Sequence, residues 1–343
     1  MTQPATIRQV LVESLDQIQI ERVPAPVAGI SEVLVRSTVV GICGSDLHAA
    51  LGRHPFIDLP YRPGHEVVGV VEALGVDVDD VKVGDRVVVE PNLYCGTCPQ
   101  CLAGRYNICR TLTVFGCQLP GGMAERFSVP ADRVHKLPDS LADRAAVLAE
   151  PLAAAVHAVG RAGDLRGCRV LVLGAGPIGL LVLLAAKRAG AELVAVTDLL
   201  PSKRQRAQRL GADAAIPADA PELAKRANAA LSGPADFVFD CVANEQTMAQ
   251  AIDSVDKGGT VLVVGVPQGP VSVRLDLVQD REISVVGNLM YVGEDMREAL
   301  TMLRTGAVPV DELVTATFPL DEAAAAFAAS HDPEQVKVLV NVS

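Results

Sequence analysis

The sequence contains no tryptophan, and aromatic residues make up only 3% of its 343 residues. Proteins that bind single-stranded nucleic acids commonly stack the bases on aromatic side chains. Acidic residues also outnumber basic ones, 41 to 30, which gives a net charge of -11. Phosphate binding, by contrast, requires clustered Lys and Arg. We therefore expect no nucleic-acid partner.

A long uninterrupted apolar run is missing as well. The longest candidate, residues 170–186, is broken by glycine and proline, so no membrane span is expected. The first residues show no basic segment followed by an apolar one, and we expect no signal peptide. These absences favour a cytoplasmic protein with reduced cysteines. With 50% hydrophobic residues, the chain is long enough for two domains with substantial cores.

Four of the cysteines lie within fifteen residues, in the run CGTCPQCLAGRYNIC. Thiolates this close in sequence can form a tetrahedral shell around one Zn²⁺. Two disulfides could use the same residues, but a reducing compartment disfavours them. An iron–sulfur cluster typically uses C-x2-C-x2-C-x3-C-P, whereas here the last gap is seven residues and Arg110 follows. We therefore expect a structural zinc bound by Cys95, Cys98, Cys101 and Cys109.

The pattern of apolar residues changes near residue 150. Before it, short β-branched runs at 33–40, 67–72 and 86–90 predict a β-rich region. After it, predicted strands alternate with predicted helices, which indicates βαβ units and a parallel sheet. The expected strands are 169–173, 193–198, 235–241, 259–265 and 282–287, and the expected helices include 150–163, 201–212, 245–256 and 294–304.

A glycine-rich turn directly follows the predicted strand 169–173. Gly174, Gly176 and Gly179 form G-x-G-x-x-G at the start of a helix, where free N–H groups can bind a pyrophosphate. Asp198 ends the next predicted strand and could accept hydrogen bonds from the adenine ribose, which favours NAD over NADP. Lys203 could cover the ribose edge or lie in solvent. A tight turn without any ligand is the alternative.

A second group of metal-binding residue types is dispersed in the sequence. Cys43, His65, Glu66 and Glu150 lie in the segments GICGSDLH, RPGHEVVG and AEPLAAAVH. Taken singly, each is more typical of a buried structural residue. Together they offer a thiolate, an imidazole and carboxylates to one catalytic zinc. Asp46 is expected to orient His65 as a hydrogen-bond acceptor.

These segments together resemble a known family. CGSDLH (43–48), GHE (64–66), the four-cysteine run, EPLA (150–153) and GAGPIG (174–179) resemble the zinc-dependent medium-chain dehydrogenase/reductases, above all the polyol and butanediol dehydrogenase branch. The resemblance implies an α/β protein in which a GroES-like domain is joined to a Rossmann domain. It implies a GroES-like domain at 1–150 with a zinc lobe at about 90–110, a Rossmann domain at 151–285, and a segment 286–343 that returns to the first domain. It also implies an active site in the cleft between the domains.

The resemblance assigns roles to single residues. Cys43 and His65 match the catalytic zinc ligands, Glu150 matches a ligand that binds directly or through water, and Glu66 matches a glutamate that can move onto the metal. Ser45 and His48 match the groups that carry the substrate proton to solvent. It implies two zinc ions, NAD, a small alcohol or polyol substrate and a homodimer or homotetramer. Cofactor contacts are expected from Gly174, Gly176, Pro177, Ile178, Gly179, Asp198, Lys203, Val266 and Leu289.

The sequence departs from the sorbitol dehydrogenases at positions expected to contact substrate. Ala49 replaces a tyrosine, and Met290 replaces the arginine of an Arg-Tyr pair whose second residue is Tyr291. Losing the arginine removes a strong hydroxyl-binding donor, so a smaller secondary alcohol or vicinal diol is favoured over sorbitol. L-threonine, cyclitol and sugar-acid dehydrogenases of the same family are alternatives, and a non-catalytic protein that binds NADH and zinc is a different class.

Overall fold

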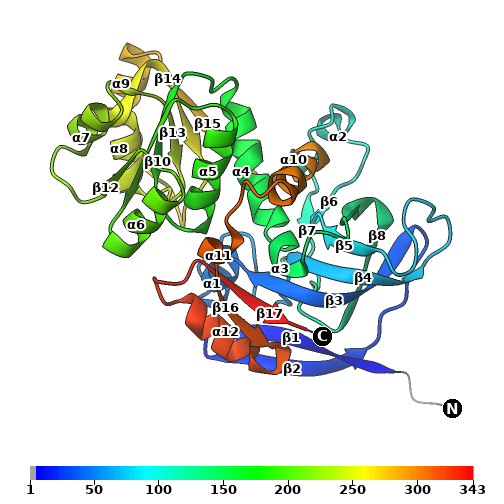
Figure 1. Cartoon of the computed structure of the whole chain (residues 1–343). Coiled ribbons are helices and arrows are strands. Elements are labelled where there is room, and N and C mark those ends of the chain that lie inside the picture. Colours follow the sequence, from blue (N-terminus) through cyan, green and yellow to red (C-terminus); the bar gives the residue numbers. More distant parts are fainter. Residues whose placement is uncertain (1–4, 343) are drawn as a thin grey trace. The chain divides into compact units, whose positions relative to one another are not determined.

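The computed structural model describes residues 5–342, which form two compact units. The first contains the chain up to Glu150 together with Val292–Gly306 and the stretch from Leu313 onward, and the second contains Pro151–Tyr291 and Ala307–Glu312 (Figure 1). The expected boundary at 285 falls inside the last strand of the second unit, β15 (Ser284–Gly287), and that unit continues to Tyr291. Within the expected segment 286–343, Val292–Gly306 and the stretch from Leu313 belong to the first unit, whereas Ala307–Glu312 belongs to the second.

The first unit is built around one mixed sheet in which β3 has three partners. The strand order is β16-β17-β3-β4-β5-β9, and β8 also pairs with β3. Residues alternate between buried and half-buried along most of β3, because one face of the sheet covers the core. The strands of this unit are β1 (Thr6–Ser14), β2 (Gln17–Pro24), β3 (Glu32–Ile42), β4 (Glu66–Leu74), β5 (Arg86–Val89), β6 (Asn92–Leu93), β7 (Thr113–Val114), β8 (Arg126–Pro130), β9 (Val134–Lys136), β16 (Val314–Pro319) and β17 (Lys337–Asn341).

Short helices complete the first unit, and its core is rich in valine. Val35, Val40, Val67 and Val87 are fully buried between the sheet and the surrounding segments, with Phe327 of α12 packed among them. The β-branched composition therefore explains both the strands and the core. The helices are α1 (Gly44–Ala50), α2 (Pro99–Leu102), α3 (Asp143–Ala146), α10 (Gly293–Arg304) and α12 (Ala323–Ser330), and α4 (Ala149–Ala162) begins at the end of this unit.

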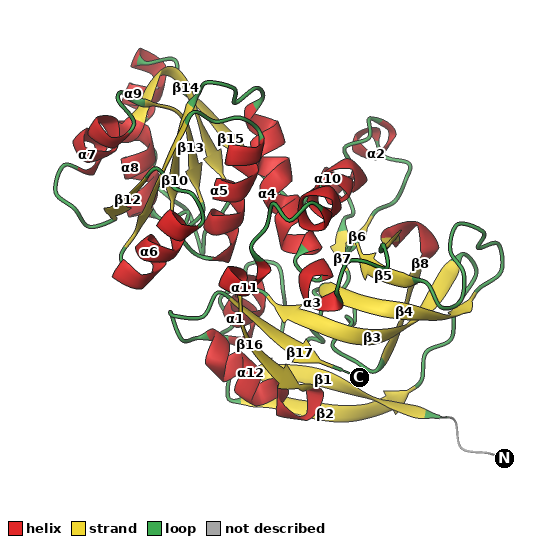
Figure 2. Cartoon of the chain, in the orientation of Figure 1, coloured by secondary structure: helices red, strands yellow, loops and turns green. Residues whose placement is uncertain are grey.

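The second unit is a doubly wound parallel sheet, as predicted. Its strand order is β12-β11-β10-β13-β14-β15, which is the 3-2-1-4-5-6 order of a dinucleotide-binding fold. Figure 2 shows helices on both faces of this sheet. The elements are β10 (Arg169–Leu173), α5 (Pro177–Arg188), β11 (Leu193–Asp198), α6 (Pro201–Arg209), β12 (Ala214–Pro217), α7 (Leu223–Ala230), β13 (Ala235–Asp240), α8 (Glu245–Ser254), β14 (Val255–Val263), α9 (Leu275–Asp280), β15 and α11 (Val310–Leu313).

The degree of burial explains which strands of the second unit could be predicted from the sequence. Val170, Leu171, Val172 and Leu173 of β10 are fully buried, because helices cover both faces of the sheet. The edge strand β12 was not predicted, since its four residues AAIP carry a weak apolar signal.

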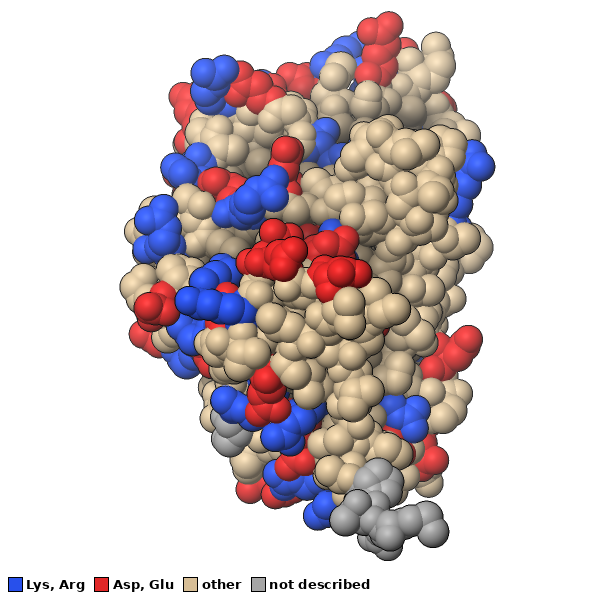
Figure 3. Space-filling model, turned by 90° about the vertical axis from the view of Figure 1, so that its right-hand side faces the viewer, with Lys and Arg blue, Asp and Glu red and all other residues tan. Residues whose placement is uncertain are grey.

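No helix among residues 5–342 is long and apolar enough to span a membrane. On the face shown in Figure 3, basic side chains alternate with acidic ones, and an extended area carries neither. This face therefore presents no continuous basic strip of the kind that follows a nucleic-acid backbone.

The packing of α5 against the glycine turn gives the first prediction. A Cβ at Gly179 would lie 1.8 Å from the carbonyl oxygen of Gly174, whereas a Cβ at Gly160 in α4 would meet nothing within 4 Å. We expect Gly179→Ala to lower the free energy of unfolding by about 1–3 kcal/mol, the usual cost of overpacking. Gly160→Ala should raise it by ~0.5–1 kcal/mol, because alanine favours helix. Equal stability of the two variants in denaturant unfolding would contradict this account.

Candidate functional site

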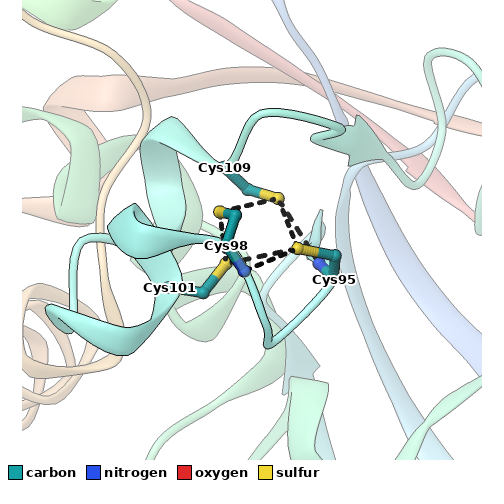
Figure 4. Close-up of side chains that lie close together, drawn as sticks. All are labelled: Cys95, Cys98, Cys101 and Cys109. Atoms are coloured by element: carbon teal, nitrogen blue, oxygen red, sulfur yellow. Dashed lines mark hydrogen bonds between the residues drawn. The ribbon is translucent and has the colours of Figure 1, made fainter.

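The four-cysteine run folds into a compact lobe whose sulfur atoms face one another (Figure 4). The Sγ–Sγ distances are 3.4 Å for Cys98–Cys101, 3.5 Å for Cys95–Cys109, and 3.9 Å for Cys95–Cys101 and Cys98–Cys109. A tetrahedral Zn–S₄ site with bonds of about 2.3 Å has edges of about 3.8 Å. All four cysteines are free of disulfides. The geometry therefore fits one tetrahedral metal ion.

Backbone N–H groups favour ionised sulfur in this lobe. Hydrogen bonds from Thr97, first from its backbone, lower the pKa of Cys95 to about 5. Hydrogen bonds from the Arg110 and Cys101 backbones lower the pKa of Cys98, whereas desolvation raises that of Cys101 to about 12. Four sulfur atoms this close cannot all ionise without a cation. A divalent metal would supply the missing charge.

A buried polar network attaches the lobe to the sheet. The rings of Tyr94 and Tyr106 stack at 4.4 Å, and the Arg133 guanidinium lies 4.6 Å from the Tyr94 ring centre. Arg133 Nη1 donates to Glu90 Oε1 at 2.9 Å, and Glu90 Oε2 lies 2.8 Å from His135 Nε2. The Gly293 N–H at the start of α10 donates to the Tyr106 hydroxyl. One set of contacts therefore holds the four-cysteine lobe to the end of β5 and to α10.

The second set of metal-binding residues is brought together from three segments. Cys43 follows β3, His65 precedes β4 and Glu66 is the first residue of β4. One ligand atom from each lies within 4.8 Å of the other two. His65 and Glu66 are buried, and Cys43 is partly buried. This donor set of sulfur, nitrogen and oxygen fits a borderline-soft ion such as Zn²⁺.

Glu150 lies outside this set of three. It is 5% exposed in the first turn of α4, and its charge contributes to raising the pKa of Lys337. The structure therefore brings together three of the four predicted ligands and keeps the fourth nearby as a buried acid.

Asp46 differs from its expected role. Its Oδ1 lies 3.8 Å from His65 Nδ1, which is within ion-pair range but too long for a hydrogen bond. The carboxylate instead accepts the Cys43 backbone N–H at 2.9 Å and the Tyr61 hydroxyl at 3.2 Å. Asp46 thereby caps α1 and fixes the backbone of Cys43. It does not hydrogen-bond to the imidazole ring of His65.

Two residues near this site were missed by the sequence reasoning. Cys117 Sγ lies 3.9 Å from His65 Nδ1, and Lys337 Nζ lies 2.6 and 2.7 Å from the two carboxylate oxygens of Glu66. Burial alone would lower the pKa of Lys337, but the Glu66 charge outweighs it and the pKa is raised. The only sequence signal was a single lysine within the apolar run VKVLVNV.

Ser45 and His48 lie one turn apart in α1, so their side chains share one side of the helix. Ser45 is half-buried and His48 is exposed. Desolvation by neighbouring atoms, and secondarily the Arg53 charge, lower the pKa of His48. The imidazole is therefore neutral at pH 7 and able to accept a proton.

The glycine turn of the second unit lies between β10 and α5, where the sequence placed it. Gly174 has φ +95°, where other residues are strained, and Gly176 has open space at its Cβ position at the start of α5. Pro177 and Ile178 form the first turn of this helix. The α5 N-terminus is thus accessible to a phosphate group.

The remaining expected cofactor residues lie at the carboxyl edge of the sheet. Asp198 ends β11, and its carboxylate accepts the N–H groups of Ala175 and Leu200, each at 2.9 Å. Val266 and Leu289 follow β14 and β15 and are 49% and 48% exposed. Lys203 is half-buried in the first turn of α6. Ligands of doubly wound sheets bind at this edge.

The positions expected to contact substrate differ in their exposure to solvent. Ala49 and Tyr291 are fully buried, whereas Met290 is half-buried with φ +48°. A positive φ in a residue with a side chain stores strain, which concentrates at functional segments.

Two family models match this chain. Residues 29–139 match the alcohol dehydrogenase GroES-like domain, and residues 177–305 match the zinc-binding dehydrogenase domain. The first match contains Cys43, His65 and the four-cysteine lobe, and the second begins at the start of α5. The matches therefore cover the set of Cys43, His65 and Glu66, the four-cysteine lobe and most of the second unit, whereas Glu150 lies between the two matched ranges.

Individual relatives are similar over nearly the whole chain. Sorbitol dehydrogenase from Ovis aries is 36% identical over 338 residues, which cover 96% of this chain and 95% of the relative. A zinc-binding dehydrogenase from Sinorhizobium meliloti bound to NADP superposes with a TM-score of 0.91 at 33% identity, covering 98% of this chain and all (100%) of the other. 2R,3R-butanediol dehydrogenase from Bacillus subtilis superposes with a TM-score of 0.90 at 30% identity, again covering 98% and 100%.

The contacts of Asp46 give the second prediction. Asp46→Ala leaves the Cys43 amide without its carboxylate acceptor, which costs about 1–3 kcal/mol for a buried group. It also removes one of the two acceptors of the Tyr61 hydroxyl, which keeps the Asp46 backbone carbonyl oxygen at 3.2 Å. We expect this variant to lose more stability in thermal unfolding than Tyr61→Phe, which removes only one donor. Asp46→Asn keeps one carbonyl oxygen and should fall between them. If Tyr61→Phe were the most damaging, the capping role of Asp46 would be wrong.

Proposed function

Because this chain belongs to the family of zinc-binding alcohol dehydrogenases with a GroES-like domain, we propose that it transfers hydride between a nicotinamide cofactor and a secondary alcohol, diol or polyol. The observation that carries the proposal is the buried set of Cys43, His65 and Glu66. The same chain contains a dinucleotide-binding sheet with a glycine turn. One unit thus supplies a metal site and the other a cofactor site.

We assign Cys43 and His65 as holders of a catalytic zinc, with Glu150 as a third acid that binds directly or through water. When bound, zinc supplies a Lewis acid that lowers the pKa of a coordinated hydroxyl group. The four cysteines of the lobe would hold a second, structural zinc with no position left for substrate. The proposal therefore predicts two zinc ions with different roles.

The chain's own residues would handle the substrate proton. Ser45 lies two residues after Cys43 and can accept a proton at its hydroxyl oxygen while donating its own. His48, one helical turn later and exposed, can pass a proton to solvent because its lowered pKa keeps it neutral at pH 7. The spacing in α1 supports this order of proton transfer.

NAD is proposed as the cofactor rather than NADP. The Asp198 carboxylate is anchored by two backbone N–H groups at the end of β11. Its negative charge there favours ribose hydroxyls and repels a 2′-phosphate. Lys203 and Arg204 in α6 are the residues that could offset this repulsion, but the Arg204 guanidinium is already bound to the carbonyl oxygens of Asp198 and Leu199, each at 2.8 Å.

The proposed substrate is a small secondary alcohol or a vicinal diol of the butanediol type. Met290 stands where the sorbitol enzymes carry arginine, and a thioether cannot donate hydrogen bonds to several hydroxyl groups. Ala49 likewise offers no hydroxyl. The similarity to butanediol dehydrogenase supports the same substrate class. We further propose a cytoplasmic homodimer or homotetramer, following the polyol dehydrogenase resemblance.

A substrate panel tests the proposed function. With NAD⁺ and zinc-replete protein, 2,3-butanediol and simple secondary alcohols should produce NADH absorbance faster than sorbitol, and NADP⁺ should support lower kcat/KM. Cys43→Ala should lose turnover by at least about a thousandfold, since a metal contributes several kcal/mol, yet still bind NADH by fluorescence. Cys168→Ala, at a cysteine outside both metal sets, is the matched control. Near-normal turnover of Cys43→Ala would overturn the assignment.

The lobe gives a separate prediction. Cys98→Ser should bind one zinc fewer per chain in metal analysis and unfold about 5 °C or more below the wild type, because structural zinc contributes folding free energy. The fraction that folds should retain turnover per remaining zinc. Cys168→Ser should leave both zinc content and unfolding temperature unchanged. An equally stable Cys98→Ser protein lacking one zinc would contradict a structural role.

A further inference from the structure

The segment 288–292 joins the two units and carries a residue expected to contact substrate. The second unit reaches Tyr291, and the first unit resumes at Val292. Within this segment Met290 is half-buried and has φ +48°, and Tyr291 is fully buried. A side chain at positive φ stores strain and persists only where the surrounding contacts determine the backbone. The contacts that hold the two ends of the segment therefore bear on where Met290 lies.

Hydrogen bonds anchor this segment at both ends. The Asn288 N–H donates to the Val263 carbonyl oxygen of β14 at 3.0 Å. At the other end, the Val292 N–H donates to Asp295 Oδ2 at 2.9 Å, at the start of α10. Only residues 289–291 lie between the two anchored ends, so a shift of the α10 end moves Met290.

The four-cysteine lobe supplies a further anchor at Gly293, the first residue of α10. The Gly293 N–H donates to the hydroxyl of Tyr106, which lies between Cys101 and Cys109 in the sequence of the lobe. A Cβ at Gly293 would lie 3.2 Å from that hydroxyl oxygen and 3.5 Å from Glu90 Oε2. Gly293 therefore permits a close approach of α10 to the lobe and to the end of β5.

The Tyr106 hydroxyl is itself held in place. It hydrogen-bonds to the Glu90 carboxylate, and burial together with the Glu90 charge raises the pKa of Tyr106 to about 12. The hydroxyl is therefore protonated at pH 7, so that it donates its one hydrogen to Glu90 and accepts with its oxygen. Glu90 is 1% exposed, and its two oxygens lie 2.9 Å from Arg133 Nη1 and 2.8 Å from His135 Nε2. Tyr106 thus offers the Gly293 N–H an acceptor at a fixed position.

We propose that Tyr106 is a positioning residue for substrate, because its hydroxyl fixes the α10 end of segment 288–292 and thereby the position of Met290. This rests on the proposed function, since it takes Met290 as a contact of the alcohol. The lobe then has a role besides folding, because its loop helps to set the affinity for the alcohol. Asn288 is anchored independently by β14, so cofactor binding at the neighbouring Leu289 depends on Tyr106 far less.

The test removes the hydroxyl alone. Tyr106→Phe keeps the ring that stacks on Tyr94 and lies below Arg133, but it leaves the Gly293 N–H without its acceptor. We expect the KM for the best alcohol of the substrate panel to rise about three- to tenfold, the change in an equilibrium to which one hydrogen bond corresponds. The kcat and the KM for NAD⁺ should stay within about twofold, because only binding of the alcohol is weakened.

Tyr94→Phe is the matched control, because it removes a hydroxyl from the same stacked pair of rings. The Tyr94 hydroxyl lies 3.5 Å from Asp132 Oδ2 and 3.2 Å from Arg133 Nη2, and neither residue belongs to α10. All kinetic constants of this variant should therefore equal those of the wild type within about twofold.

Hydrogen exchange follows the segment itself without turnover. In mass spectrometry of the full-length protein, peptides covering 288–293 should exchange at least about threefold faster in Tyr106→Phe and at the wild-type rate in Tyr94→Phe. Asp295→Ala frees the Val292 N–H at the same end, so it should raise both the exchange rate and the KM for the alcohol. Asp295→Asn keeps an acceptor oxygen and should restore wild-type values of both.

The outcomes separate this inference from the proposed function. Unchanged exchange in Tyr106→Phe would overturn the inference, and so would faster exchange with an unchanged KM for the alcohol. An equal rise of KM in Tyr94→Phe, or a Tyr106→Phe protein that does not fold, would give these hydroxyls a general structural role and contradict positioning. If the zinc-replete wild type oxidises no alcohol with NAD⁺, the proposed function fails, whereas the exchange rates still decide whether Tyr106 positions the segment.

Discussion

The candidate catalytic site depends on the central position of β3 in the sheet of the first unit. β3 pairs with β4, β8 and β17 at different points along its length. Its end delivers Cys43, its neighbour β4 delivers Glu66 and its other neighbour β17 delivers Lys337. Glu66 and Lys337 are 271 positions apart in the sequence. The backbone hydrogen bonds of the sheet thus bring their side chains together. The register of three strands, rather than any local motif, sets the distances within the site.

Charge compensation is the second requirement, because this site is buried. Glu66 is 0% exposed and Lys337 is 3% exposed, and removing one partner of such a pair usually costs about 3–5 kcal/mol. A buried ion pair adds little net stability compared with apolar packing. Within this buried site, the pair compensates two charges that would otherwise be isolated from water.

The sequence predicted the parts of the molecule that local chemistry determines. The cysteine spacing predicted the tetrahedral lobe, and the glycine pattern predicted the turn between β10 and α5 that lies beside Asp198 at the end of β11. The apolar runs predicted the buried strands but missed β12, whose four residues are weakly apolar. The partners of Asp46 and the position of Lys337 could not be predicted, because Tyr61 and Glu66 become their neighbours only after the sheet has formed.

The two candidate metal sites of the first unit differ in where their residues come from. The lobe cysteines lie within fifteen residues, and backbone N–H groups of the same segment donate to their sulfur atoms, so all of its candidate ligands come from one loop. The Cys43 site needs the sheet complete, including β17 from the last residues of the chain. Glu66 and Lys337 can therefore pair only once β17 has joined the sheet beside β3.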